Sequence, residues 1–366
     1  MAIERFPCPN CRADMEFDPA TGGIKCSYCG TQHQIQSGVR TTVMENPLSS
    51  ELLQPDPSRI QRLSTISKEF TCTGCGATVQ FEPPQVAGAC PFCAANIVAQ
   101  PKDSDPLIAP DGVLPFAVVK EQATANVKGW LASLWFAPGA LAAMARPEGM
   151  CGMYLPFWTF DAKTSTRYNG QRGEYYYETV QVRQNINGQD VLREVQEQRT
   201  SWRAAQGSVG VAFDDVVVPA TRSVSSDRLR KLEPWSLSDV KPYDSAFLSG
   251  FQAQRYQVEL EDGFVAGKEI MERAIQDEIR RDIGGDDQQI SSAQTRYGSL
   301  TFKHLLLPVW VGSYRFDGRV FQMIVNAQTG EVDGERPFSK GKVLLLIIVI
   351  ILILVFLMWR SGQAQA

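Results

Sequence analysis

A run of seventeen apolar residues, from Val343 to Trp359, constrains this chain of 366 residues more than any other feature. The run contains no charge, glycine or proline, so it predicts a helix without a polar face. At 1.5 Å per residue such a helix reaches about 26 Å, just short of the roughly 30 Å hydrocarbon core of a bilayer. We therefore predict a transmembrane helix over 343–359 and a short tail over 360–366. The alternative is a buried helix of a soluble core.

The compartment of the remaining chain follows from three observations. The N-terminus lacks the apolar segment of a secretory signal peptide. Lys340 and Lys342 precede the run and Arg360 follows it, which mildly favours a cytoplasmic N-terminal side. Eight of the nine cysteines fit a metal-ligand pattern that requires thiolates, and a reducing cytoplasm maintains these. We predict a single-pass protein of the inner (cytoplasmic) membrane, with its bulk in the cytoplasm. A run without polar residues argues against a pore or pump.

The cysteines form two copies of one motif, placed 64 residues apart. In each copy fourteen residues separate two Cys-x-x-Cys pairs, so each copy directs four thiolates at one point. Four thiolates close the tetrahedral shell of Zn²⁺ and leave no open position, which predicts two structural zinc sites with four cysteine ligands each. Disulfides are the alternative, which the missing signal peptide disfavours. The predicted ligands are Cys8, Cys11, Cys26 and Cys29 in the first copy and Cys72, Cys75, Cys90 and Cys93 in the second.

The expected fold class is two small zinc ribbons (β) plus an α+β domain with an antiparallel sheet, and one C-terminal transmembrane helix. Proline-rich, polar segments between these parts predict extended linkers that leave the ribbons some freedom. The predicted boundaries are zinc ribbon 1 over 1–36, a linker over 37–67, zinc ribbon 2 over 68–95, a linker over 96–113, and the α+β domain over 114–338.

Within the α+β domain, periodicity predicts amphipathic helices over 119–136 and 268–283. Strands are expected at 153–161, 175–182, 191–198 and 304–311, with hairpin turns at Asn187-Gly188 and Asp317-Gly318. The tetrapeptide Leu-Pro-x-Trp occurs at 155–158 and again at 307–310. We interpret this recurrence as a pseudo-repeat around 154–161 and 306–313.

Several longer motifs accompany the Cys-x-x-Cys pairs: Trp-Leu-x-x-Leu-Trp-Phe-Ala-Pro (130–138), Tyr-Leu-Pro-Phe-Trp-Thr-Phe-Asp (154–161), Tyr-Asn-Gly-Gln-Arg-Gly (168–173) and Val-Asn-Ala-Gln-Thr-Gly (325–330). Over nearly the whole chain the sequence resembles a bacterial family of membrane-anchored zinc-ribbon proteins. Members are often labelled transcription-factor-IIB-type zinc ribbon proteins or primosomal-protein-N′-like helicases. Some relatives are associated with membrane-stress systems, so the resemblance implies an adaptor role at the inner membrane.

The sequence favours a protein that is not an enzyme. A helicase motor needs a phosphate-binding loop, but the nearest stretch (263–269) is one residue short and has Glu269 where the Mg²⁺-binding hydroxyl belongs. Cys151 is more typical of a small buried residue than of a nucleophile, because the chain has only two histidines, His33 and His304. The acidic residues show no spacing typical of a catalytic pair; the candidates are Asp161, Glu174, Asp214 and Asp215.

The charge of the ribbons disfavours nucleic acid as a partner. Residues 1–36 hold three basic and four acidic residues, and residues 68–100 hold one and two. Each four-thiolate zinc centre adds a further charge of about −2, so neither ribbon offers a basic face to phosphates. We expect a membrane-anchored, non-enzymatic adaptor that docks protein partners at the cytoplasmic face and contacts lipid through 343–359. The alternatives are a membrane-tethered nucleic-acid-binding ribbon protein and a hydrolase-like domain using Asp161, Asp214 or His304.

Overall fold

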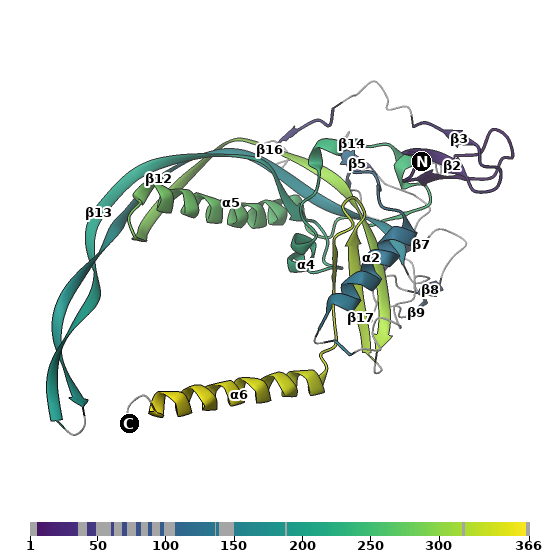
Figure 1. Ribbon diagram of the computed structural model, residues 1–366. Helices are drawn as coiled ribbons and strands as arrows, with labels where there is room; N and C mark the ends of the chain where they lie inside the picture. The colour runs from purple at the N-terminus through teal and green to yellow at the C-terminus, as the bar shows by residue number, and fades with distance from the viewer. Residues whose placement is uncertain are drawn as a thin grey trace.

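The computed structural model describes residues 6–35, 42–48, 60–61, 68–71, 78–81, 87–89, 96–98, 107–135, 137–138, 150–186, 189–316 and 319–363. Three very long strands dominate it: β12 (Cys151–Ile186), β13 (Gln189–Pro219) and β16 (Asp287–Phe316). They lie side by side and extend from the body of the protein as a curved, twisted projection (Figure 1).

The sheet is mixed, with the order β13-β12-β16-β11-β14. β12 is antiparallel to both β13 and β16, whereas the short β11 is parallel to β16 and β15 is parallel to β12. The predicted turn residues Asn187 and Gly188 lie outside the described residues, but Ile186 pairs with Gln189 on either side of them. The shorter strands are β4 (Asn46–Pro47), β11 (Gly112–Val113), β14 (Lys241–Pro242), β15 (Gln252–Ala253), β17 (Arg319–Asn326) and β18 (Val332–Gly334).

At its start β12 is buried on both faces, as expected for an almost continuous apolar run. Met153, Leu155 and Phe157 belong to a cluster that also contains Leu229 of α4 (Ser226–Lys231). Tyr154 points to the opposite face, into a cluster formed mainly with α2 (Lys120–Ser133) and β17. The core of the body therefore lies on both sides of β12 and β16.

Farther out, β12 is buried on one face only. From residue 162 to 169 the even positions are buried and the odd positions are exposed, the period-two pattern of a half-buried strand. Helix α5 (Leu260–Ile283) covers the buried face through Met271, Ile275 and Ile279. This helix lies on the concave side of the arched strands (Figure 1).

The predicted α+β domain with an antiparallel sheet is wrong: the chain forms one large mixed β-sheet with only four α-helices among the described residues. The strands predicted at 153–161 and 175–182 are parts of a single strand, β12. The polar residues between them, such as Lys163 and Arg167, suggested a loop but occupy the exposed face of that strand. The predicted helices are confirmed as α2 and, extended toward its N-terminus, α5.

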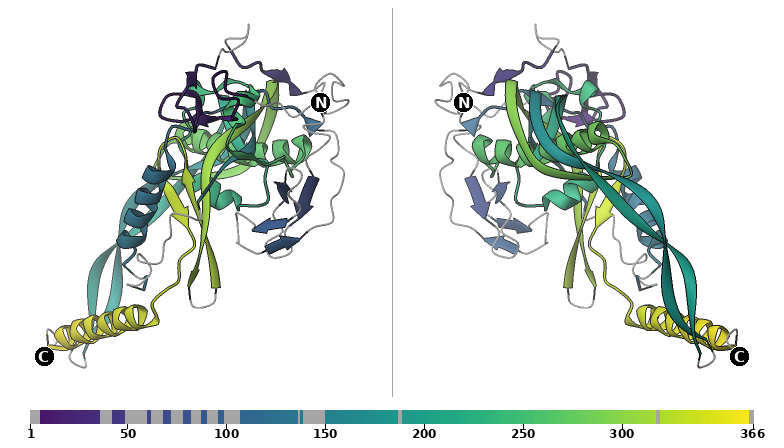
Figure 2. Two further views of the ribbon diagram at one scale, coloured as in Figure 1. Left: turned by 90° about the vertical axis from the view of Figure 1, so that its right-hand side faces the viewer. Right: turned by 90° about the vertical axis from the view of Figure 1, so that its left-hand side faces the viewer.

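The predicted transmembrane helix is also wrong. The apolar run forms α6 (Lys340–Gln363), but within the described ranges the structure contains no helix with the length and apolar character needed to cross a membrane. The run of seventeen residues reaches only about 26 Å, and Lys342 and Arg360 flank it. The predicted single-pass localisation in the inner membrane is therefore contradicted. Figure 2 shows α6 extending away from the body on the same side as the outer ends of β12 and β13.

The side chain of Lys342 joins the start of α6 to the body of the protein. The Lys342 ammonium group donates hydrogen bonds to the carbonyl oxygens of Trp135 and Ala137, at 2.8 and 2.9 Å, just beyond the C-terminal end of α2. A cation is favourable there because a helix C-terminus carries a partial negative charge. Beyond this point the apolar side chains from Leu344 to Leu357 are each between 42 and 62% exposed.

Candidate metal centre

Two tight turns in the first ribbon place four cysteines together. Cys8 and Cys11 precede β1 (Met15–Asp18), and Cys26 ends β2 (Gly23–Cys26) before the turn that contains Cys29. The Cys8 amide donates to the carbonyl oxygen of Ala13 at 2.7 Å, and the Arg12 amide donates to that of Cys8 at 2.9 Å.

The second turn repeats this hydrogen-bond pattern. The Cys26 amide donates to Thr31 at 2.9 Å, and the Gly30 amide donates to Cys26 at 3.0 Å. The residue four positions after each first cysteine has a left-handed backbone, with φ of 64° at Arg12 and 76° at Gly30. The two turns thus present their thiols in the same way, and β3 (Gln32–His33) follows the second turn.

The four sulfur atoms have the spacing of a tetrahedral metal site. All four Sγ atoms lie within 4.8 Å of one another, and the Cys8–Cys29 and Cys11–Cys26 distances are both 3.4 Å. Four sulfurs at about 2.3 Å from one zinc ion would be about 3.8 Å apart. This cluster of four cysteines could therefore hold a metal ion, as predicted for the first copy.

The thiols differ in their environment. Cys8 and Cys26 are buried, whereas Cys11 and Cys29 are exposed. The Thr31 hydroxyl, 3.1 Å from the Cys29 sulfur, lowers the pKa of Cys29 to about 6. The Ala13 amide lowers the pKa of Cys11, but the neighbouring thiols of Cys26 and Cys29 outweigh it and raise this pKa to about 12. Without a metal the cluster retains protons, and a divalent cation would displace them.

The first ribbon packs against the body, although extended linkers had suggested freedom. Met15 and Ile24 share a cluster with Ala246 of η3 (Ser245–Leu248), and the rings of Phe17 and Phe247 are 5.5 Å apart. Two hydrogen bonds join Ser249 to the strand: its hydroxyl donates to the Met15 carbonyl at 2.7 Å and its carbonyl accepts from Phe17 at 2.9 Å.

The cysteines of the second copy, Cys72, Cys75, Cys90 and Cys93, lie outside the described residues. The strands around them are described: β6 (Lys68–Thr71) pairs with β7 (Thr78–Phe81), and β8 (Ala87–Ala89) with β9 (Asn96–Val98). Their register repeats that of the first ribbon at the sequence offset of 64. Thr71 opposite Thr78 matches Pro7 opposite Asp14, and Gly88 opposite Ile97 matches Ile24 opposite His33.

The other cysteine and the histidines lie apart from this cluster. Cys151 is half-buried in β12, and burial raises the pKa of its thiol. His304 is buried beside Trp158, with ring centroids 4.8 Å apart and its Nδ1 3.0 Å from the carbonyl oxygen of Ile108. His33 is exposed on β3. Each of these positions fits packing or a surface role.

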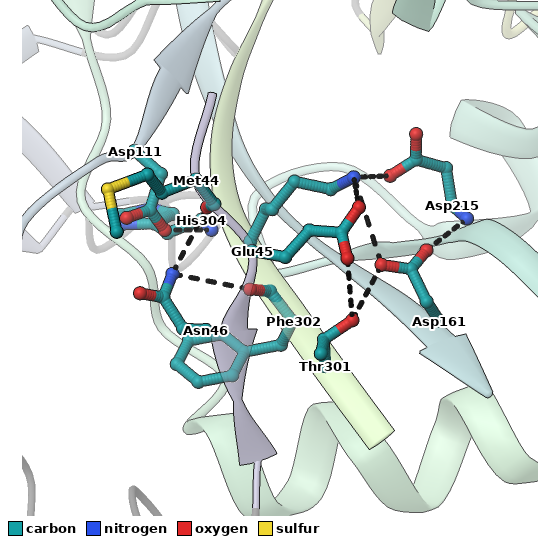
Figure 3. A network of polar contacts seen from close by, with 10 residues as sticks. Met44, Glu45, Asn46, Asp111, Asp161, Asp215, Thr301, Phe302 and His304 are labelled. Carbon is teal, nitrogen blue, oxygen red and sulfur yellow. Dashed lines mark hydrogen bonds and ion pairs between the residues drawn. The ribbon is translucent and has the colours of Figure 1, made fainter. Parts of the chain in front are cut away.

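Two of the acidic candidates surround a lysine that sequence reasoning missed (Figure 3). The Lys303 ammonium group lies 2.6 Å from Asp215, 3.8 Å from Asp161 and 3.5 Å from Glu45. Burial alone would lower the pKa of Lys303, but the hydrogen bond that it donates to Asp215 and the nearby carboxylates raise it. Asp161 also accepts hydrogen bonds from the Asp215 amide and the Thr301 hydroxyl. The contact between Glu45 and Lys303 joins segment 42–48 to the sheet.

Asp161 and Asp214 do not form a pair for acid–base chemistry. Asp161 is buried and accepts the hydrogen bonds just described, whereas Asp214 is exposed. Glu174 lies in β12 just beyond the start of β16 and pairs with Arg172 at 3.3 Å. No short-range signal in the sequence links Lys303 to its partners, which come from three separate segments.

Comparisons with known proteins give one informative likeness. No family model matches the chain, and no solved structure matches it. The chain is 27% identical over 342 residues to the uncharacterised protein YdjG of Bacillus subtilis (strain 168), and the alignment covers 93% of this chain and 92% of that protein. This likeness therefore extends over most of the chain.

Proposed function

We propose that this chain is a non-enzymatic zinc-ribbon protein that docks a protein partner. The observation that carries the proposal is the cluster of four cysteine sulfurs within 4.8 Å, formed by two turns with matching hydrogen bonds. A site of four thiolates has no open coordination position, so its metal supports structure and does not activate water or substrate.

The metal is zinc, because four thiolates in tetrahedral geometry are the ligand set of structural zinc sites. A second site of the same kind, formed by Cys72, Cys75, Cys90 and Cys93, is part of the proposal. Its support is the strand register, which repeats that of the first ribbon at the same offset as the cysteines. A module this small gains much of its folding free energy from its metal.

The docking surface is the exposed second cysteine turn of the first ribbon. Tyr28 lies between Cys26 and Cys29 and is 84% exposed. Exposed tyrosines are frequent energetic centres of protein interfaces. The surface around it is acidic once zinc is bound, which favours a partner with a basic or neutral face over a nucleic-acid backbone.

The experiment is in-cell crosslinking of the full chain followed by mass spectrometry of the partners. Tyr28→Ala should remove the main crosslinked partner while the zinc content of the purified protein stays unchanged. Phe338→Ala is the matched control, because Phe338 is also an exposed aromatic residue, at 60%, but lies outside the first ribbon. A partner set unaffected by Tyr28→Ala would overturn docking through this ribbon, and cysteine clusters without zinc would overturn the metal assignment.

A further inference from the structure

The outer part of the β12–β13 hairpin is a two-stranded arm. β16 begins at Asp287, opposite Gly173, so within the described residues β12 from Glu174 to Ile186 pairs only with β13. We call Glu174–Ile186 and their partners Gln189–Ser201 the arm, which ends in the tip at the lower left of Figure 1. A two-stranded ribbon is marginally stable by itself in water.

Two hydrogen bonds show which way the backbone of the arm points. The Asp286 amide donates to the Gly173 carbonyl at 2.9 Å, and the Tyr175 amide donates to the Asp286 carboxylate at 2.8 Å. The Gly173 carbonyl and the Tyr175 amide therefore both point to the side of β12 that faces away from β13. Because the direction alternates along a strand, Tyr177, Thr179, Gln181 and Arg183 also direct their N–H and C=O groups away from β13. The arm therefore presents an open edge for strand pairing.

The two edges of the arm differ in protection. On β13 the residues 192–199 include four charged side chains, namely Arg193, Glu194, Glu197 and Arg199. Their partners on β12, residues 176–183, include two, namely Glu178 and Arg183. Charged side chains discourage an edge strand from pairing with another chain. The β12 edge is the one that remains suited to a partner.

One face of the arm carries an exposed apolar patch where α5 no longer covers it. The even positions of β12, which α5 buries farther in, continue beyond it as Glu174, Tyr176, Glu178, Val180 and Val182, and Glu178 is paired with Arg199 of β13 at 2.9 Å. Val180 lies directly opposite Val195 on β13, and Val182 and Val195 are 47 and 43% exposed. These three valines lie next to the open edge, and a further strand would cover them.

We infer that the partner of this edge is the same edge of a second copy, paired antiparallel about a two-fold axis at Val180. This register centres on the open stretch beyond the Asp286 contact, whose outward-pointing residues run from Tyr177 to Arg183. Each outward-pointing residue meets another, Tyr177 opposite Arg183 and Thr179 opposite Gln181, as a hydrogen-bonded ladder requires.

Side-chain chemistry supports the same register. Glu178 lies opposite Val182, so no like charges face each other across the axis. Val180 meets its symmetry mate, which aligns Val195, Val180, Val180 and Val195 in one row across four strands. An interface in which one surface meets itself is the usual form of a homodimer. This inference is independent of the proposed zinc-dependent docking.

A matched pair of proline substitutions tests the edge. Gln181→Pro removes an N–H group that points away from β13, so it breaks no hydrogen bond within the arm. Gln196→Pro does the same on the outer edge of β13. Its neighbour Val195 is hydrogen-bonded to Val180 of β12, so the N–H of Gln196 points away from β12. Sedimentation of the full chain over a concentration series should show a dimer that Gln181→Pro weakens about tenfold or more, because each dimer loses the bond twice. Gln196→Pro should leave the dimer intact.

A cysteine scan tests the register. Val180→Cys should give a disulfide-linked dimer under mild oxidation, because the two symmetry-related positions form a close, non-hydrogen-bonded pair. Val182→Cys, which faces Glu178, should remain at the wild-type background. A monomeric wild-type chain, a dimer that resists Gln181→Pro, or equal crosslinking at both positions would each overturn the inference. Zinc content should be unchanged in all four variants, which separates this result from the fate of the proposed docking function.

Discussion

Gly30 and Arg12 hold the same place in the two cysteine turns, and both have a left-handed backbone, with φ of 76° and 64°. The turn geometry requires this conformation, because the amide of each residue closes a hydrogen bond to the first cysteine of its pair. Glycine adopts it without strain, whereas a residue with a side chain costs roughly 1–2 kcal/mol.

Exchanging the residue types at these positions should change stability in opposite directions. Arg12→Gly should stabilise the zinc-loaded chain by about 1 kcal/mol, and Gly30→Ala should destabilise it by a similar amount, although its added Cβ would meet open space. Denaturant unfolding of the ribbon, followed by zinc release, measures both. Gly129→Ala in α2 also fills open space but has a helical backbone, so it should be neutral or stabilising.

Removing one thiol should release the metal of the first ribbon. Cys29→Ser should reduce the zinc content of the chain by one ion and speed hydrogen exchange at 245–251, because the folded ribbon packs Phe17 on Phe247. Cys151→Ser, at the cysteine outside the cluster, is the control and should leave both readouts unchanged. Zinc content that is equal in the two variants would contradict the assignment.

The Thr31 hydroxyl should control the acidity of Cys29 in the metal-free protein. Its contact at 3.1 Å is the largest of several hydrogen bonds, including one from the Thr31 amide, that together lower the pKa of Cys29 from its ordinary value of 9.0 to about 6. Because the folded state favours the Cys29 thiolate, the fold gains stability at pH values above the pKa of this thiol in the unfolded chain. This gain is lost as the pH falls through the folded-state pKa of about 6. Thr31→Val should therefore move the alkylation midpoint of Cys29 upward, measured by peptide mass spectrometry across pH. Thr21→Val, whose hydroxyl contacts the Asp18 carbonyl, should not move it.

Lys303 should stabilise the fold by neutralising the buried carboxylate of Asp161 and the half-buried carboxylate of Asp215. Its side chain is 10% exposed and contacts Asp215 and Asp161. Lys303→Met should lower the free energy of unfolding by about 3 kcal/mol at neutral pH, because it leaves those charges without their cation. Urea unfolding measures this loss, and Lys163→Met on the exposed face of β12 is the control, with a change below about 0.5 kcal/mol.

Local sequence patterns predicted the parts of this fold that depend on local geometry. The Cys-x-x-Cys spacing located the four thiols of the first ribbon, and helical periodicity located α2 and most of α5. The length of β12 was not predicted, since polar residues such as Lys163 and Arg167 interrupt the apolar pattern while occupying one face of the strand. Hydrophobicity alone also gave a transmembrane helix that the structure contradicts.

Long-range partners carry no local signal. Lys303 meets Asp215 from 88 positions earlier in the chain and Glu45 from a segment predicted to be a linker. In the same segment β4 pairs with β16, and Leu48 is fully buried. Only the assembled sheet brings these residues together, so composition and periodicity could suggest acidic candidates but not their cation.

The glycines of the stretch that superficially resembles a phosphate-binding loop should prove to be packing residues. A Cβ at Gly263 would lie 2.6 Å from the Trp158 ring, and one at Gly267 would lie 3.0 Å from Phe160, so both allow α5 to approach the sheet. Gly263→Ala should destabilise the chain by about 2 kcal/mol, even though alanine favours a helix, because the indole is fully buried and cannot move aside. Thermal unfolding measures this against Gly129→Ala, which adds the same methyl group to a helix without a neighbour. A Gly263→Ala variant as stable as the wild type would show that the contact with Trp158 does not set the helix–sheet distance.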